Sequence, residues 1–462
     1  MKNVTKYTLL LLWMVSTWSF GQEPQDCLSI QGDFVALTDS GKYRFTAEEG
    51  SHRQSQGLSS INFTELTSYQ QYITASQRLI ADKNPRATMP CPIITDTYQQ
   101  LAKQNNWSAT PEISQLIAPF ELPQGNKEKA ILLIHGLTDS PFIFHDLAQF
   151  FYQQGFTVRT LLLPGHGTAP SGLLDVSYQE WQHATKFAIE TTLHDFEQVY
   201  LGGFSTGGAL IFDYLMQQPV ANKKIKGLLM WSPASKAKND SAWLAQYVDY
   251  IPFVDWIDLD ADIDFAKYES FPYNAAAQVH GIMSRIVGEN AMDDRVLHDI
   301  PLFVVASEHD QTINTKQTLL LIEQWQQQAS TAKTKKSALI YYGDKGSLPP
   351  TLLTSIKVMV PSCSAGEICE GIFDIAHTAT TNAPDNPHYG AAGQYRNCGH
   401  YQTEPARYQE CKEASKTIKG ELRPENLNKE QPLQRLTYNP YYQHMLATMT
   451  GFLRATQLSV SD

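Results

Sequence analysis

The stretch from Leu201 to Gly208 reads LGGFSTGG and places Ser205 midway between Gly203 and Gly207. An apolar run from Gln198 to Gly203 precedes the serine, and helical spacing follows from Thr206 to Met216. A tight strand-to-helix turn projects a serine hydroxyl free of its own backbone, and glycines on both sides make room for it. An ordinary glycine-rich turn is the alternative, but the flanking strand and helix favour Ser205 as a nucleophile.

Buried strands alternate with helices on both sides of this turn. Continuous apolar runs are typical of strands buried on both faces, and their alternation with helices predicts a parallel sheet covered on both faces. The fold class is therefore α/β. Strands are expected at 130–134, 157–163, 198–203, 225–231 and 302–306, and helices at 142–153, 178–193 and 206–216.

The alternation of strands and helices is interrupted twice, and these interruptions divide the chain into segments. Residues 22–116 form an N-terminal extension whose best element is a helix at 63–83, with Asn62 and Glu65 spaced as a capping box. Core segments are predicted at 117–234 and 301–462, the second carrying a disulfide-containing insertion. Between them, residues 235–300 show no clean strand and are expected to form a helical cap.

The first residues have the pattern of an export signal. Lys2 and Lys6 precede an apolar run from Tyr7 to Phe20, and residues 1–21 are interpreted as a signal peptide. A retained membrane anchor is the alternative, but this run is shorter than the roughly 20 residues that span a bilayer. We therefore expect a periplasmic or extracellular protein without a stable membrane span.

Export would place the six cysteines in an oxidising compartment, where an even count favours disulfides over metal sites. Fifteen connectivities are possible in principle. The simplest pairing joins Cys27 to Cys91, Cys363 to Cys369, and Cys398 to Cys411. No cysteine and histidine spacing resembles a zinc site, and the predicted chemistry needs no cofactor.

The formal net charge of −11 argues against nucleic acid as a partner, since phosphate binding needs clustered lysine and arginine. The same charge disfavours anionic membrane surfaces. A small-molecule or lipid ester remains the expected partner.

A serine nucleophile needs a base, an acid that orients the base, and donors for the oxyanion. Asp310 follows the run at 302–306 and is the expected acid, with Glu308 as its rival. His377 directly follows an apolar run and is the expected base, with His388 and His400 as rivals in the same C-terminal stretch.

Two backbone N–H groups are expected to form the oxyanion hole. Thr206 N–H lies at a helix start, where backbone amides are unpaired and the helix dipole favours an anion. Leu137 N–H is the second, because it lies in the loop after the strand at 130–134. His135, in the same loop, is interpreted as a residue that shapes the turn.

Four segments together carry a resemblance to a known family. They are LLIHGLTDSPF at 132–142, LLPGHGTAP at 162–170, GFSTGG at 203–208 and ASEHDQTI at 306–313. The chain resembles the α/β-hydrolase superfamily over about 117–453, specifically the monoacylglycerol-lipase and carboxylesterase-like branch with a cap after the sixth strand. This resemblance implies Ser205, Asp310 and His377 as nucleophile, acid and base, Leu137 and Thr206 as oxyanion donors, and ester hydrolysis through an acyl-enzyme.

Two other functions stay open on the residues. A proline-iminopeptidase-like peptidase shares the fold and the triad and would bind a substrate amino terminus through a cap carboxylate, for which the aspartates between Asp255 and Asp264 are candidates. A non-catalytic envelope protein retaining the fold is the other. The aromatic residues of the cap, from Trp243 to Trp256, either line an acyl pocket or form the cap's own small core.

Overall fold

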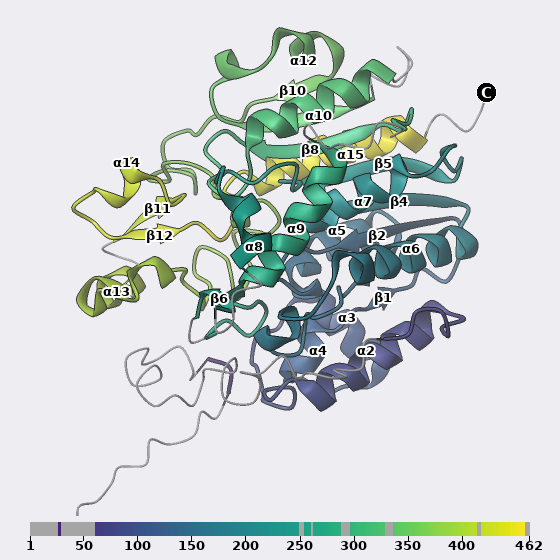
Figure 1. Ribbon diagram of the computed structural model, residues 1–462, viewed down its shortest axis with the longest axis horizontal. Coiled ribbons are helices and arrows are strands. Elements are labelled where there is room, and N and C mark those ends of the chain that lie inside the picture. Colours follow the sequence, from purple (N-terminus) through teal and green to yellow (C-terminus); the bar gives the residue numbers. More distant parts are fainter. Residues whose placement is uncertain are drawn as a thin grey trace, which may run out of the picture.

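A computed structural model describes residues 26–28, 61–248, 254–259, 262–287, 296–328, 336–413 and 417–457. The predicted signal peptide lies outside these residues. A mostly parallel sheet runs in the order β1-β3-β2-β4-β5-β8-β9-β10, with β1 antiparallel to β3 (Figure 1). Its strands are β1 (Glu121–Leu122), β2 (Lys129–Ile134), β3 (Thr157–Leu161), β4 (Gln198–Phe204), β5 (Ile225–Trp231), β8 (Leu302–Ser307), β9 (Ala338–Tyr342) and β10 (Lys357–Met359).

The central strands are buried along almost their whole length, as their continuous apolar sequences predict. Strand β4 lies between β2 and β5, with Gly203 paired to Ile134 on one side and to Met230 on the other. The residue after β4 is Ser205, which therefore stands at the carboxyl edge of the sheet centre. The α/β class expected from the alternation is confirmed.

Helices cover both faces of the sheet and form two separate apolar cores. Helices α5 (His145–Gln153) and α15 (Tyr442–Gln457) pack on one face, and the short η2 (Pro141–Phe144) precedes α5. The other face carries α6 (Tyr178–Asp195), α7 (Thr206–Met216), α9 (Tyr273–Ile286) and α10 (Thr315–Gln328). Near the β10 edge lies α12 (Pro350–Ser355), and short turns occur at η3 (Pro170–Leu173) and η5 (Lys345–Ser347).

The N-terminal extension contributes α2 (Tyr69–Lys83), α3 (Asp96–Asn105) and α4 (Ile113–Ile117). The helix expected to start at residue 63 starts at Tyr69, because the Ser68 hydroxyl accepts from Gln71 N and caps it there. The predicted capping pair, Asn62 and Glu65, does hydrogen-bond, but within a separate turn. The buried side chain of Tyr72 joins α2 to the loop after β3, donating to Leu162 O at 3.1 Å.

The insertion between β5 and β8 is partly helical. It contains η4 (Ala242–Leu244), α8 (Ala245–Val248), β6 (Trp256–Asp258), β7 (Phe271–Pro272) and α9. The antiparallel β6–β7 pair corrects the expectation of a strand-free cap; both strands are too short to show a period in the sequence. The cap lies between β5 and β8, which are neighbours in the sheet, and one antiparallel strand precedes β2 in the described chain.

The aromatic cap residues do not pack into one enclosed core. Trp243 is 46% exposed and Tyr247 is 60% exposed, and their rings contact each other edge to face. Trp256 is half-buried, while Tyr250 and Phe253 lie outside the described residues. Among the residues with coordinates described above, no helix is long and apolar enough to cross a bilayer.

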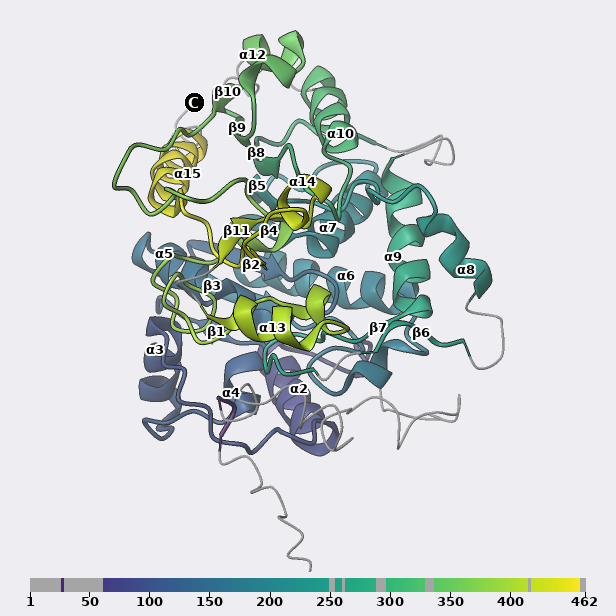
Figure 2. The ribbon, with the colours of Figure 1, turned by 90° about the vertical axis from the view of Figure 1, so that its left-hand side faces the viewer.

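A long excursion separates β10 from α15. It contains η6 (His377–Ala379), η7 (Gly399–Tyr401), α13 (Pro405–Lys412), β11 (Ile418–Gly420), α14 (Pro424–Leu427) and β12 (Leu433–Arg435). These elements lie on the same side of the sheet as the cap (Figure 2). The parallel β11–β12 pair is their only described ladder of strands.

All three expected cysteine pairs are disulfide-bonded: Cys27–Cys91, Cys363–Cys369 and Cys398–Cys411. The first ties the chain before α2 to the segment between α2 and α3. The other two lie in the excursion, where they close short loops. This part of the chain has little regular secondary structure. The disulfides limit the conformations that its loops can adopt in the unfolded state.

Candidate active site

Ser205 occupies the strained turn that its glycine neighbours predict. Its backbone has φ 49° and ψ −115°, a conformation that costs a non-glycine residue energy. A Cβ on Gly203 would lie 2.4 Å from Gly208 N, and a Cβ on Gly207 would lie 1.9 Å from Ile134 O. Glycine is therefore required at both positions for steric reasons, and the serine is 7% exposed.

The structure brings Ser205, His377 and Asp310 together in one hydrogen-bonded chain. His377 Nε2 lies 3.0 Å from Ser205 Oγ, and His377 Nδ1 lies 2.6 Å from Asp310 Oδ2. Both distances are within the range for proton transfer and for an orienting hydrogen bond. The imidazole and the carboxylate are almost fully buried, so little solvent competes for these contacts.

Asp310 is oriented by its own loop. Its Oδ1 accepts hydrogen bonds from Thr312 N and Ile313 N, each at 2.7 Å, which leaves Oδ2 facing His377. The rival carboxylate, Glu308, turns away and accepts from Asp344 N at 2.7 Å. Asp310, and not Glu308, therefore lies against His377.

The two rival histidines are engaged elsewhere. His388 is fully buried and its Nε2 lies 2.9 Å from Asp264 Oδ1 in the cap. His400 Nε2 lies 3.1 Å from Leu433 O, and burial lowers the pKa of this histidine to about 4. Neither ring has a hydrogen bond to Ser205 in the described structure.

The two expected oxyanion donors follow two different strands. Thr206 N begins α7 directly after Ser205, and Leu137 N lies in the loop after β2. Within the described part of the chain, neither N–H donates to a backbone acceptor. The next residue, Thr138, has φ 67° and donates its N–H to His166 Nε2 at 3.1 Å, which fixes the loop.

His135 shapes this loop, as interpreted from the sequence. Its Nε2 accepts from Leu163 N at 3.1 Å, and its Nδ1 lies 2.7 Å from Gly136 O. Burial, followed by the nearby His166, lowers the pKa of His135 well below its ordinary value. Both ring nitrogens of His135 contact backbone groups, and in the described structure the ring has no hydrogen bond to Ser205.

A second carboxyl group, Asp139, lies in the same loop and was not selected from the sequence. Its side chain lies close to Gly136, because a Cβ on that glycine would be 2.7 Å from Asp139 Oδ2. Burial raises the pKa of Asp139 to about 7, against the opposing charges of Lys267 and His377. The feature of the sequence that could have pointed to Asp139 is its position in the loop after β2, close to Leu137.

Two of the cap aspartates that were candidates for binding a peptide amino terminus are already bound within the protein. Asp262 is fully buried and accepts from Ser270 Oγ at 2.6 Å and from Ser270 N at 2.9 Å. Asp264 is fully buried between His388 and Tyr389, whose hydroxyl donates to it at 2.8 Å, so this carboxylate joins the cap to the C-terminal excursion. Two other candidates, Asp255 and Asp258, are not buried.

A cavity of about 200 Å³ lies between the loop after β3 and the N-terminal extension. Its walls include Phe63, Leu162 and His166. Ser205, His377 and Asp310 do not line this cavity, so it is separate from the site around the Ser205 hydroxyl.

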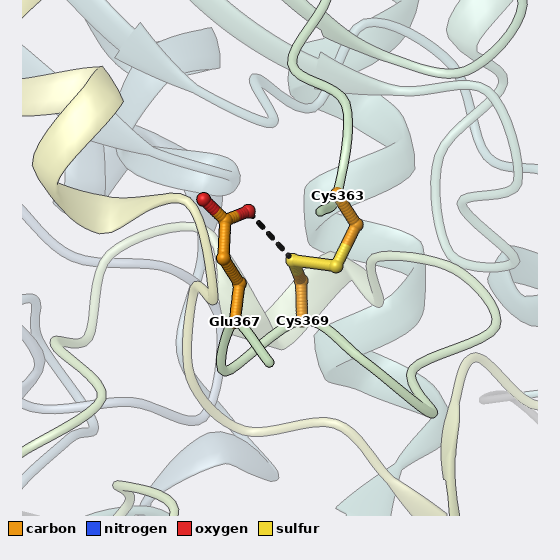
Figure 3. A group of neighbouring side chains, drawn as sticks. All are labelled: Cys363, Glu367 and Cys369. Atoms are coloured by element: carbon orange, nitrogen blue, oxygen red, sulfur yellow. Dashed lines mark hydrogen bonds between the residues drawn. A yellow bond between two sulfur atoms is a disulfide. The ribbon is translucent and has the colours of Figure 1, made fainter. Parts of the chain in front are cut away.

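One group of side chains has the spacing of metal ligands, namely Cys363, Glu367 and Cys369 (Figure 3). The two cysteines form a disulfide, which removes the thiolates that would bind a metal ion. Glu367 Oε2 lies 3.6 Å from Cys369 Sγ. This group is therefore a structural clip.

The sheet order, the strained nucleophile turn and the covering helices define the α/β-hydrolase fold. Residues 129–252 match the family model described as the alpha/beta hydrolase fold. The α/β-hydrolase fold expected from the four sequence segments is confirmed, and so is the resemblance that they carry.

The sequence relatives lie in the carboxylesterase and monoacylglycerol-lipase branch, as the resemblance predicted. A carboxylesterase of Bacillus subtilis (strain 168) is 22% identical over 233 residues, which are 49% of this chain and 87% of that protein. A thermostable monoacylglycerol lipase of Bacillus sp. (strain H-257) is 24% identical over 187 residues, 40% of this chain and 72% of its own. The crystal structure of a Paleococcus ferrophilus monoacylglycerol lipase aligns with a TM-score of 0.37 at 19% identity, covering 55% of this chain and 91% of that one.

Proposed function

We propose that this protein is a serine hydrolase of carboxylic esters. The observation that carries the proposal is the chain of two hydrogen bonds from Ser205 Oγ through His377 to Asp310, at 3.0 and 2.6 Å. It lies on the turn that this chemistry requires, in a chain similar to a carboxylesterase and a monoacylglycerol lipase.

In the proposed reaction, Ser205 Oγ attacks the ester carbonyl carbon while His377 Nε2 takes the hydroxyl proton. The imidazolium is oriented and stabilised by Asp310, which stays ionised. The same proton then passes to the leaving alcohol as the ester C–O bond breaks. Water attacks the acyl-enzyme with His377 again as base, and the acid is released.

The tetrahedral intermediates carry a negative oxygen. In this proposal Leu137 N and Thr206 N donate to that oxygen, and the start of α7 adds the favourable end of its dipole. The donors belong to two different loops, so their spacing depends on the contact of Gly207 with Ile134. The reaction needs neither a metal ion nor an organic cofactor.

Export from the cytoplasm is part of the proposal. It is supported by the signal-like residues 1–21 and by the three disulfides, since disulfides persist in oxidising compartments outside the cytoplasm. Cell fractionation with an antibody against the protein would test it. Recovery from the cytoplasm with free thiols would contradict it.

A panel of p-nitrophenyl esters of graded acyl length tests the activity and reports the preferred acyl group. A fluorophosphonate probe tests the nucleophile, since it labels only an activated serine. We expect ester turnover and labelling in the wild type and neither in Ser205→Ala. A wild type that folds but neither turns over esters nor labels would favour a non-catalytic envelope protein.

The peptidase alternative is distinguished by aminoacyl-naphthylamides in the same assay. Asp262 and Asp264 are buried and hydrogen-bonded, so they offer no free carboxylate to a substrate amino terminus, whereas Asp255 and Asp258 are not buried. Because the chain is similar to a carboxylesterase and a monoacylglycerol lipase, we expect esters to be cleaved with the higher kcat/KM. Faster cleavage of the naphthylamides would reverse the assignment.

A further inference from the structure

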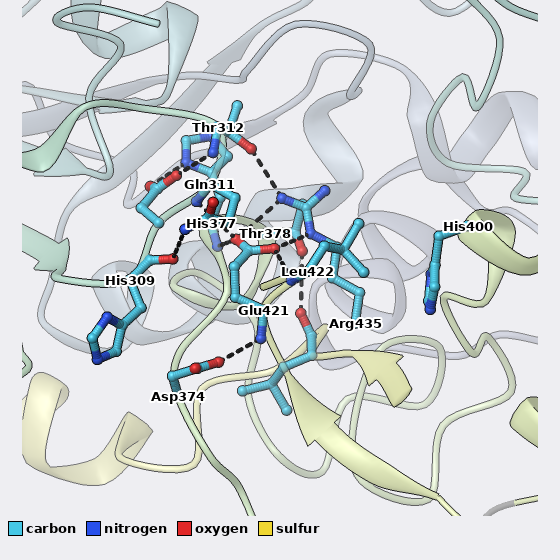
Figure 4. A network of polar contacts seen from close by, with 12 residues as sticks. His309, Gln311, Thr312, Asp374, His377, Thr378, His400, Glu421, Leu422 and Arg435 are labelled. Atoms are coloured by element: carbon cyan, nitrogen blue, oxygen red, sulfur yellow. Dashed lines mark hydrogen bonds and ion pairs between the residues drawn. The ribbon is translucent and has the colours of Figure 1, made fainter. Parts of the chain in front are cut away.

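A buried ion pair in the C-terminal excursion contacts both loops that carry the acid and the base. We propose that Glu421 and Arg435 are positioning residues for the Asp310–His377 pair. Figure 4 shows their side chains between the two loops. The inference rests on the proposed function, because it concerns how the same triad is held.

Glu421 is completely buried just after β11. Its Oε2 accepts from His377 N at 2.9 Å and lies 3.5 Å from Gln311 N, next to Asp310. One carboxylate oxygen therefore joins the backbone of the base to the backbone of the acid loop. Asp310 and His377 are 67 positions apart in the chain, so this oxygen connects two segments that are distant in sequence.

Arg435, at the end of β12, completes the connection from the other side. Its Nε donates to Glu421 Oε1 at 2.7 Å, and its Nη2 donates to Thr312 Oγ1 at 2.9 Å. Thr312 N in turn donates to Asp310 Oδ1. The guanidinium fork thus spans Glu421 and the acid loop, a geometry that the point charge of lysine cannot reproduce.

The pair is held rigidly, which a positioning role requires. Asp374 Oδ1 accepts from Glu421 N at 2.5 Å, and β11 pairs with β12 so that Gly420 lies beside Arg435. Burial alone would raise the pKa of Glu421, but the charge and hydrogen bonds of Arg435 hold that pKa below its ordinary value. Glu421 is therefore an ionised acceptor.

The charges around His377 give the pair a signature in pH dependence. Asp310 and Glu421 are the carboxylates in contact with this residue, Asp139 is the buried carboxyl that interacts with it at longer range, and Arg435 is the cation paired to Glu421. Phe204 packs on the ring without charge. A negative charge near an imidazole favours its protonated form, and a positive charge disfavours it.

The test is the acid limb of the pH profile of kcat/KM, which reports protonation of the base. In Glu421→Gln the lost negative charge should move this limb to lower pH by roughly half a unit or more. In Arg435→Met the uncompensated carboxylate should move it to higher pH by a similar amount. The double variant should return toward the wild-type limb, and kcat should fall about tenfold in all three because the triad is loosened.

Arg435→Lys separates charge from geometry. The lysine keeps the positive charge, so the acid limb should stay near the wild type, while the lost link to Thr312 should still lower kcat. Full wild-type kcat in a folded Arg435→Lys protein would contradict the role of the fork.

The chain offers a matched control in the first two strands at the β1 edge of the main sheet. Arg159 lies 2.6 Å from Glu121 and 2.7 Å from Asp195, with only 6% of its side chain exposed. Glu121→Gln and Arg159→Met repeat the same chemical changes far from His377. We expect them to lower stability and leave the acid limb in place; equal shifts in the controls would overturn the proposal.

A second readout does not require turnover. In a Ser205→Ala background, nuclear magnetic resonance can follow the titration of the His377 ring, and its midpoint should move down with Glu421→Gln and up with Arg435→Met. Shifts of the same sign, or none, in folded proteins would refute the positioning role. Absence of ester hydrolysis in the wild type with these opposite shifts present would instead refute the proposed function alone.

Discussion

Replacing each of the two buried histidines in turn separates the base from its nearest rival. His377 and His388 both contact a buried aspartate, at 2.6 and 2.9 Å, and both are nearly inaccessible to solvent. They differ in what the other ring nitrogen contacts. His377 Nε2 faces Ser205 Oγ, whereas His388 Nδ1 is buried without a hydrogen-bond partner in the described structure.

His377→Ala should remove catalysis and leave the fold. Loss of a triad base lowers kcat by about 10⁴ to 10⁶ in enzymes of this mechanism. His388→Ala should leave catalysis in the folded molecules and reduce the stability of the fold. It leaves Asp264, fully buried, with Tyr389 and the backbone as its remaining donors, and breaking a buried pair in this way costs about 3 to 5 kcal/mol.

The assay measures both quantities on each protein. Denaturant unfolding followed by fluorescence gives the change in stability, and p-nitrophenyl ester turnover per folded molecule gives kcat. We expect both variants to unfold earlier than the wild type, because each leaves a buried aspartate without its histidine. Only His377→Ala should lose activity per folded molecule, and His388→Ala should keep most of it. An inactive, stable His388→Ala together with an active His377→Ala would refute the assignment of the base.

Three further predictions follow from single contacts. Asp310→Asn should lower kcat by about 10⁴, because an amide at this position favours the wrong imidazole tautomer, and pre-steady-state ester hydrolysis would measure it; a loss below tenfold would argue against Asp310 as the orienting acid. Gly207→Ala should reduce the free energy of unfolding by about 4 kcal/mol or more, because its Cβ would lie 1.9 Å from Ile134 O, whereas Gly451→Ala, with no atom within 4 Å, should be tolerated; equal unfolding midpoints would contradict this. Burial raises the pKa of Asp139 from 3.8 to about 7, so between these pH values the folded state binds more protons than the unfolded state. The stability of the wild type should therefore fall as pH rises from about 4 to about 7, and urea unfolding across that range should show no such fall in Asp139→Asn. An unchanged dependence on pH in the variant would show that Asp139 is not the source.

Much of the central fold follows from local patterns. The strand at 225–231 and the helix at 206–216 have the bounds that the sequence predicts, since both are long, periodic and buried. The GFSTGG turn is equally local, because its steric requirement involves residues that are close in the chain or paired in adjacent strands. The disulfide pairs were predictable because each joins the nearest available cysteines.

Other elements carry no such local signal. The helix start at Tyr69 was missed because a weak capping pattern at Asn62 competed with the cap at Ser68. The two-residue strand β7 covers only one period of a strand pattern, so the sequence shows no repeat there. The buried carboxylate pairs of the cap were read from the sequence as exposed candidates.

The sequence by itself determined the α/β architecture, the position of Ser205 and the loops in which its partners had to lie, because periodic burial and glycine sterics act between near neighbours. Only the tertiary structure decided which histidine reaches the serine and which buried carboxylate, Glu421, supports it. His377 and Glu421 are 44 residues apart and lie in irregular chain. A contact made by a single hydrogen bond between residues that are distant in the chain produces no repeating pattern in the sequence. Only the folded structure shows it.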